Sequence, residues 1–253
     1  MQQPQGQQHN QYDPSYAPGT YGRGGTAAQA APATRAKFIE RTYLHLAGAI
    51  FAFVGLEAVL LNTEFGLNLA RTMLSGSWLV VLIAFMAVSW IADRWARSDR
   101  GQGMQYLGLA LYVVAEAIIF CPLMFIANSV SMQEAGGSVI LPAGVTTLAV
   151  FAGITGYVFI SKQNFSWIRG GLTAASFAAL AIIVLSLLFG FHLGMLFMGV
   201  MVLLAGGYVL YYTSNVLHEY DTNSHVAAAL ALFAAIALMF WYILQIFMGG
   251  GRD

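Results

Sequence analysis

Residues Gly206 to Phe247 read GGYVLYYTSNVLHEYDTNSHVAAALALFAAIALMFWYILQIF. An apolar run leads into this stretch, a polar patch from Thr213 to His225 interrupts it, and a second long apolar run follows. The patch is too short to form a domain, so the stretch predicts two helices in lipid joined by a turn. Aspartate, asparagine, glutamate and histidine side chains gather at this turn, which makes it a first place to look for chemistry.

The composition of the whole chain agrees with a membrane protein. Of 253 residues, 58% are hydrophobic and 9% are charged, whereas about 25% are charged in an ordinary soluble domain. Such a chain cannot cover itself with polar surface, so its solvent is the lipid bilayer. The 11 basic residues balance the 11 acidic ones, which gives no reason to expect a nucleic-acid partner. Cys121 is the single cysteine, so no disulfide forms within one chain.

Two segments differ in composition. Residues 1–37 are rich in Gln, Pro, Gly and Tyr, and we expect a disordered cytoplasmic tail there. Residues 38–253 form the membrane domain, an all-α bundle of seven transmembrane helices. In the fourth apolar run, Gly144, Gly153 and Gly156 are expected to let neighbouring helices approach closely. The seven runs are Thr42–Leu61, Trp78–Ala96, Met104–Asn128, Val139–Ser161, Leu172–Phe189, Leu193–Thr213 and Val226–Phe247.

The basic residues predict the orientation of the bundle. Nine of them fall on one side of the predicted helices, and Arg71 and Arg252 fall on the other. The N-terminus is therefore expected in the cytoplasm, and an odd number of spans places the C-terminus outside. A re-entrant last helix would instead return the C-terminus to the cytoplasm.

Several fragments, taken in order, resemble the bacterial branch of the Bax-inhibitor (transmembrane Bax inhibitor motif) family. The resemblance covers about Phe38 to Phe247 and implies seven helices with the last one in the middle of the bundle. It also implies a bacterial inner-membrane protein that acts as a pH-sensitive cation (calcium) leak or regulates membrane-protein quality control. The fragments are FIERTYLHL (38–46), GVTTLAVFAGITGY (144–157), NFSW (164–167), GYVL (207–210) and VAAALALF (226–233).

The sequence departs from this family at two positions. Family members that leak calcium typically carry one aspartate near the end of the sixth helix and another within the seventh. Aligned on the fragments above, these positions are occupied by Tyr212 and Ala235. The usual carboxylate pair is therefore absent.

Two other acidic residues, Glu57 and Glu116, lie inside apolar runs. An ionisable group at membrane depth is costly and marks a functional candidate. Counted from the basic flank, both lie at similar depth, so we expect them to form a substitute carboxylate pair on an ion pathway. The alternatives are that Glu57 reaches the outer interface and that Glu116 bonds a neighbouring helix. His45, one turn past Arg41, is a candidate pH sensor, because imidazole changes charge near neutral pH, or else an interfacial hydrogen-bonding group.

The turn before the last helix offers His218, Asp221 and His225. Their spacing would align them on one helical face, where imidazole and carboxylate suit a transition metal whose identity the sequence does not specify. Alternatively, Asp221, Asn223 and Ser224 cap the start of the last helix.

Enzyme motifs are absent from the sequence. It has no His-Glu-x-x-His, no Gly-x-Ser-Gly and no phosphate-binding glycine loop, so we expect neither an enzyme nor a cofactor. Calcium enters only as a possible transported ion. Two functions remain: a pH-modulated cation leak using Glu116 and Glu57, or a non-conducting regulatory or scaffold subunit whose partners are other membrane proteins.

Overall fold

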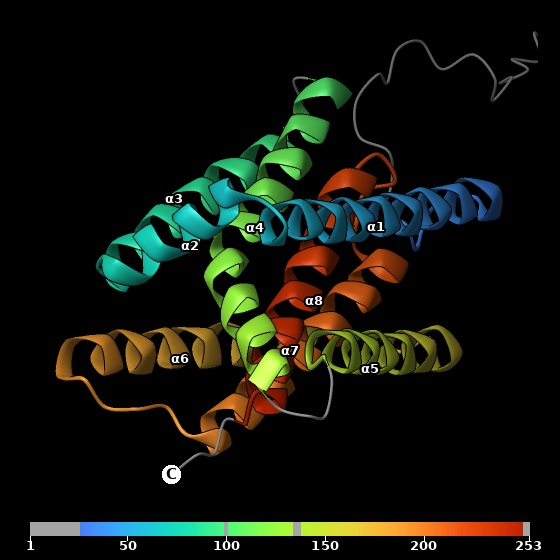
Figure 1. Ribbon diagram of the computed structural model, residues 1–253. Helices are drawn as coiled ribbons and strands as arrows, with labels where there is room; N and C mark the ends of the chain where they lie inside the picture. Colours follow the sequence, from blue (N-terminus) through green and yellow to red (C-terminus); the bar gives the residue numbers. More distant parts are fainter. Residues whose placement is uncertain (1–25, 99–100, 134–137, 250–253) are drawn as a thin grey trace, which may run out of the picture.

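A computed structural model describes residues 26–98, 101–133 and 138–249 (Figure 1). These residues form eight α-helices, one 3₁₀ turn and a single isolated β-bridge. The segments are α1 (Pro32–Leu61), α2 (Glu64–Ser75), α3 (Trp78–Ala96), α4 (Gln102–Gln133), α5 (Ile140–Ser161), η1 (Ser166–Ile168), α6 (Arg169–Phe189), α7 (Met195–His218) and α8 (His225–Phe247).

All helices except α2 are long and apolar enough to cross a membrane, which confirms the predicted seven-helix bundle. The sequence reading missed α2, because its 12 residues are too few and too polar to span a membrane. The Thr63 side chain caps this helix by accepting a hydrogen bond from the backbone N–H of Gly66. One side of α2, including Ala70 and Met73, packs on the bundle, while the rest is mostly exposed.

The first helix begins earlier than expected. Pro32 opens α1, where its missing N–H costs nothing, and the helix continues through Lys37 into the apolar run. Residues 32–37 of the predicted tail are therefore helical, and the division of the chain at residue 37 stays a prediction. The chain is also held just before α1, because the Ala27 N–H donates to the Tyr220 carbonyl at 2.8 Å and Thr26 forms a β-bridge with Asp221. Residues 1–25 of the predicted tail lie outside the described residues.

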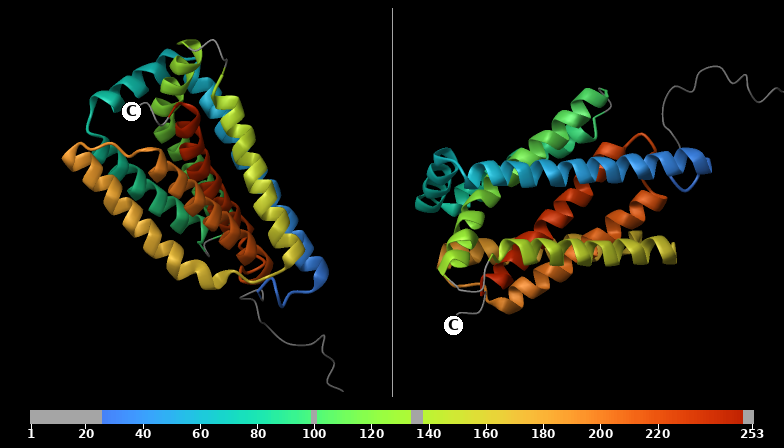
Figure 2. Two further views of the ribbon diagram at one scale, coloured as in Figure 1. Left: turned by 90° about the horizontal axis from the view of Figure 1, so that it is seen from below. Right: turned by 45° about the vertical axis from the view of Figure 1, so that its right-hand side comes forward.

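The last helix, α8, occupies the centre of the bundle, as the resemblance implied (Figure 2). In its most apolar window, 83% of residues are buried, and it packs chiefly against α7, α1, α5 and α4. Alanines such as Ala228 and Ala229 are fully buried and let these neighbours approach closely. It runs as one continuous helix of 23 residues, which is long enough to cross a membrane.

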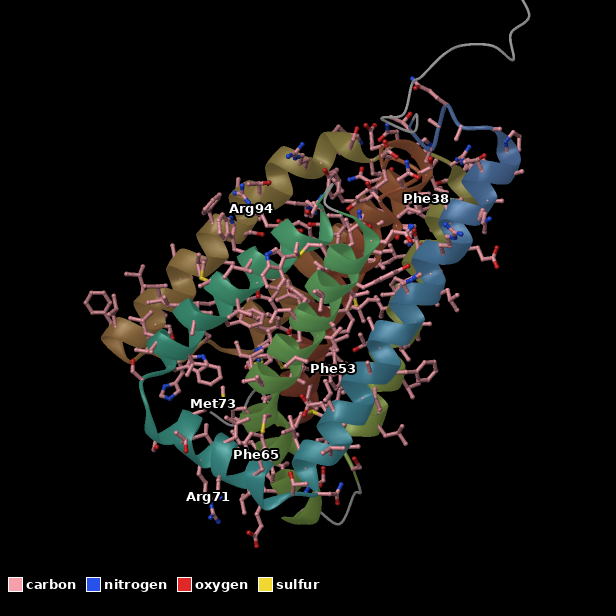
Figure 3. All side chains as sticks on the ribbon, turned by 90° about the horizontal axis from the view of Figure 1, so that it is seen from above. Phe38, Phe53, Phe65, Arg71, Met73 and Arg94 are labelled. Carbon is pink, nitrogen blue, oxygen red and sulfur yellow. The ribbon has the colours of Figure 1, made fainter. Side chains whose placement is uncertain are left out.

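The described basic residues divide between the two ends of the bundle as predicted. Arg94 lies at the same end as Phe38 of α1, whereas Arg71 of α2 lies at the other end (Figure 3). We call the first of these the basic end. It contains the start of α1, α4, α6 and α8 and the finish of α3, α5 and α7. Near it, Asp93 and Arg97, four residues apart on α3 and its C-cap, form an ion pair at 2.8 Å.

A glycine sets the tightest contact between α3 and α4. A Cβ atom at Gly108 would overlap the backbone of Ala92 and Ala96, both of which are buried. The glycines named from the sequence do not play this part. Gly144, Gly153 and Gly156 face open space, so the prediction of close helix approach at α5 was wrong.

Gly108→Ala is expected to destabilise the bundle by about 1–3 kcal/mol, because the new methyl group forces α3 and α4 apart. Gly55→Ala is the matched control, since nothing lies near that glycine and alanine favours the helix by about 0.5–1 kcal/mol. Thermal unfolding in detergent measures both. Equal melting temperatures for the two variants would contradict the α3–α4 contact.

Candidate functional site

A cavity of about 560 Å³ lies between α3, α4, α6, α7 and α8 and is partly open to the surface. We call it the Glu116 cavity. Glu116 of α4 is only 5% exposed and is the one acidic side chain among the described residues that line it. The Tyr112 hydroxyl, one turn earlier on α4, interacts with the Glu116 carboxyl group. A single carboxyl group thus lies in a largely apolar chamber.

Aromatic side chains form much of the cavity wall. Trp78 of α3 stacks on Trp241 of α8 with ring centroids 6.3 Å apart, and Phe120 meets Trp241 edge-on at 4.9 Å. Such ring pairs pack rigidly and add about 0.5–1.5 kcal/mol each beyond the area they bury. The chamber is therefore held open by stiff side chains of three helices.

A second cavity of about 410 Å³ lies at the basic end, and we call it the vestibule. Arg97, Arg169 and Glu219 bring charge to it, and Asn215 and Tyr220 bring polar groups. Burial raises the pKa of the Tyr220 hydroxyl, so this group stays neutral near pH 7 and can still donate a hydrogen bond.

Some charged groups of the vestibule have partners and others do not, among the described residues. Arg97 pairs with Asp93, and Glu219 accepts a hydrogen bond from the Asn164 amide at 3.0 Å. Arg169 has no ion-pair partner within the described part of the chain. Arg169 therefore lines the vestibule with no carboxylate partner among those residues.

Two tyrosines of α7 separate the vestibule from the Glu116 cavity. Tyr208 and Tyr212 line both cavities, and their rings stack with centroids 5.6 Å apart. The Tyr208 hydroxyl is 2.8 Å from the Ser176 hydroxyl of α6 and also donates to the Leu172 carbonyl. This pair of rings forms the partition between a polar chamber and an apolar one.

The structure does not bring Glu57 and Glu116 together. Glu57 is buried at 2% exposure, which excludes the outer-interface alternative, and neither carboxyl oxygen has a hydrogen-bond partner within the described part of the chain. Its carboxyl group interacts with Cys121, whose thiol donates to the Gly66 carbonyl of α2. Glu57 does not line the Glu116 cavity. Similar depth did not predict their separation. Glu116 points from α4 into the cavity, whereas Glu57 of α1 lies against the side of α4 that carries Cys121.

His45 lies in a cluster of rings at the basic end. Its ring stacks on Tyr106 of α4 at 5.4 Å and lies 5.0 Å from the ring of His225 of α8. The His45 Nδ1–H donates to the Arg41 carbonyl at 2.6 Å, which matches the hydrogen-bonding alternative and leaves sensing open. The His45–His225 contact was not expected from the sequence, because it joins helices 180 residues apart.

The expected face of His218, Asp221 and His225 does not form. Helix α7 continues to His218 and then stops, so the three residues do not share one helix. His218 bonds the Ser214 carbonyl, Asp221 accepts from the Asn223 N–H, and His225 packs on His45. No group of three metal-binding side chains occurs in the described residues. Asp221 shapes the turn, as the capping alternative proposed in part, but Ser224 at the N-cap makes no side-chain bond.

Comparison with known proteins gives the family. The model of the family described as inhibitor of apoptosis-promoting Bax1 matches residues 35–253. The chain belongs to this Bax-inhibitor family. An uncharacterized protein of Pseudomonas aeruginosa is 34% identical over 120 residues, which are 47% of this chain and 54% of that protein.

Two eukaryotic relatives carry informative names. Bax inhibitor 1 of Schizosaccharomyces pombe is 34% identical over 113 residues, 43% of this chain and 41% of the relative. Protein lifeguard 4 of Mus musculus is 29% identical over 107 residues, 42% of this chain and 45% of the relative. The chain thus spans about half the length of the relatives compared.

The two positions at which this sequence departs from the Bax-inhibitor pattern lie at the same cavity. Tyr212 and Ala235, where family members typically carry aspartates, both line the Glu116 cavity. The carboxyl group of Glu116 therefore enters the same chamber from a third helix. Sequence reasoning named Glu116 but missed the tyrosine partition and the vestibule, although the closely spaced tyrosines of GYVLYY were a visible signal.

Replacing Glu57 by methionine is expected to stabilise the protein by about 1 kcal/mol or more, because neither buried carboxyl oxygen has a hydrogen-bond partner to lose among the described residues. Glu40→Met on an exposed side of α1 serves as the control and should leave the melting temperature unchanged. A lower melting temperature for Glu57→Met would show that the carboxyl group is bonded in the folded protein.

Proposed function

We propose that this protein is a pH-dependent cation leak and not an enzyme, with Glu116 as the group that exchanges a proton and meets the ion. One observation carries the proposal: Glu116 is the acid that lines the chamber in which the family positions Tyr212 and Ala235 meet. Intramembrane acids that face a cavity commonly mark ion or proton pathways.

The chamber offers oxygen ligands to a passing cation. Ionised Glu116 supplies one carboxylate, and the Tyr112 hydroxyl lies beside it. Calcium prefers six to eight oxygen ligands, so a site with one carboxylate holds it weakly. Weak binding suits transit, because an ion must leave the site as readily as it enters. Protonation of Glu116 removes the charge and stops this step.

The path proposed runs from the vestibule through the tyrosine partition to Glu116. Tyr208 and Tyr212 border both chambers, so movement of these two rings opens or closes the connection. The basic end is assigned to the cytoplasm on the positive-inside rule, and the membrane is proposed to be the bacterial inner membrane.

Flux of calcium and of protons into proteoliposomes, measured from mildly acidic to mildly alkaline buffer, tests the proposal. Wild-type protein is expected to show a leak that changes with pH, and Glu116→Gln to lose at least about tenfold in flux together with the pH dependence. Glu57→Gln is the matched control, because this acid lies in the membrane but outside the cavity.

Other outcomes contradict the proposal in different ways. A leak that survives unchanged in Glu116→Gln removes Glu116 from the pathway. Absence of flux at every pH, with correctly folded protein, favours the non-conducting regulatory role in membrane-protein quality control or stress survival.

A further inference from the structure

The vestibule and the Glu116 cavity lie end to end but differ in chemistry. The vestibule presents arginine, asparagine and tyrosine groups, whereas the Glu116 cavity is walled mainly by apolar and aromatic side chains. A ligand that fills both must pass between the rings of Tyr208 and Tyr212 at the partition, and it needs a polar head and a long apolar tail. We propose that the two chambers together bind one phospholipid molecule, with the phosphate headgroup in the vestibule and an acyl chain in the Glu116 cavity.

The headgroup half rests on three side chains. Arg169 from the start of α6 and Arg97 from the end of α3 converge on the vestibule, and arginine matches the geometry of phosphate oxygens. Asn215 of α7 lines the same chamber, is 7% exposed, and leaves its side-chain Oδ1 without a partner within the described part of the chain. This Oδ1 atom is a hydrogen-bond acceptor, so it can accept from an amine of the headgroup but not from its phosphate.

A carboxylate also faces the headgroup position. Glu219 lines the vestibule and repels phosphate, but it attracts a headgroup that carries an amine as well. The charges therefore fit phosphoethanolamine, in which phosphate meets the arginines and the amine meets Glu219.

The acyl-chain half rests on the shape of the Glu116 cavity. Its lining on α7 extends from Phe197 to Tyr212, a difference of 15 positions, or about 22 Å at 1.5 Å per residue. This length suits an extended chain. Its volume of about 560 Å³ lies within the range of ligand pockets, which are mostly apolar with a few polar groups.

The cavity also reaches the lipid-facing surface. Helices α3 and α6 form two of its walls and lie side by side on one flank of α8 (Figure 2). Leu187 of α6 lines the cavity and is still 38% exposed. A chain from the surrounding bilayer can therefore enter between α3 and α6 without passing through water.

Lipid binding is independent of conduction and is measured without it. A bound chain would share the chamber with Glu116, so it would compete with ions for that space. The proposal stands if the protein conducts nothing, and a leak can exist without it.

Native mass spectrometry of the full chain in mild detergent tests the site. Dioleoyl phosphatidylethanolamine is expected to bind one molecule per chain. Ala179→Phe, which fills the cavity from α6, should weaken this binding at least about tenfold. Ala178→Phe is the control, since the neighbouring residue is exposed and does not line the cavity. Equal binding by the two variants would overturn the placement of the chain.

Two further comparisons test the headgroup. Arg169→Gln should weaken the binding of phosphatidylethanolamine about tenfold, whereas Arg71→Gln at the opposite end should not.

Dioleoylglycerol, which lacks phosphate, and glycerophosphoethanolamine, which lacks chains, should each bind at least about tenfold more weakly than the whole lipid. Equal binding of dioleoylglycerol would remove the headgroup site. Equal binding of glycerophosphoethanolamine or inorganic phosphate would show an anion site and not a lipid site.

Discussion

The structure depends on one constraint, the burial of α8 by protein instead of lipid. A helix in this position needs neighbours on nearly every side, and α7, α1, α5 and α4 supply them. Its alanines allow close approach because apolar helices in a membrane associate through van der Waals packing and not through the hydrophobic effect. Where α8 presents Ala235 to α4, α6 and α7, the small side chain leaves part of the Glu116 cavity unfilled.

Hydropathy predicted the seven spans and, with the family resemblance, the central helix. It also placed Glu57 and Glu116 at similar depth, but depth does not give the direction of a side chain. Glu116 and Cys121, five residues apart, point about 140° apart around α4, and Glu57 lies on the side of Cys121. Rotation about the helix axis comes from packing, as does the contact of His45 with His225. Hydropathy did not predict the amphipathic helix α2, because this helix is too short and too polar to cross a membrane.

The chemistry of the site follows from what replaces the usual aspartates. Tyr212 lacks the charge of the usual aspartate. It provides an aromatic ring that stacks on Tyr208, and the two rings divide the interior into two chambers. Ala235 also lacks that charge, and its small side chain leaves part of the Glu116 cavity empty. Among the described residues, Glu116 alone brings a carboxyl group to that space, and the proposed leak assigns control of the chamber's charge to its protonation. The same two rings separate the polar vestibule from the largely apolar Glu116 cavity. The proposed leak and the proposed lipid site both use these two chambers.

One side of α8 borders an open chamber, while its other sides meet protein. Thiol labelling of Ala235→Cys and Ala237→Cys, each in a Cys121→Ala background, tests it most directly. Both positions are almost fully buried on the same helix, at 3% and 5% exposure, but only Ala235 lines the cavity. A small methanethiosulfonate reagent should modify the cysteine at 235 at least about tenfold faster than the one at 237. Equal rates, or no reaction at 235, would contradict the chamber.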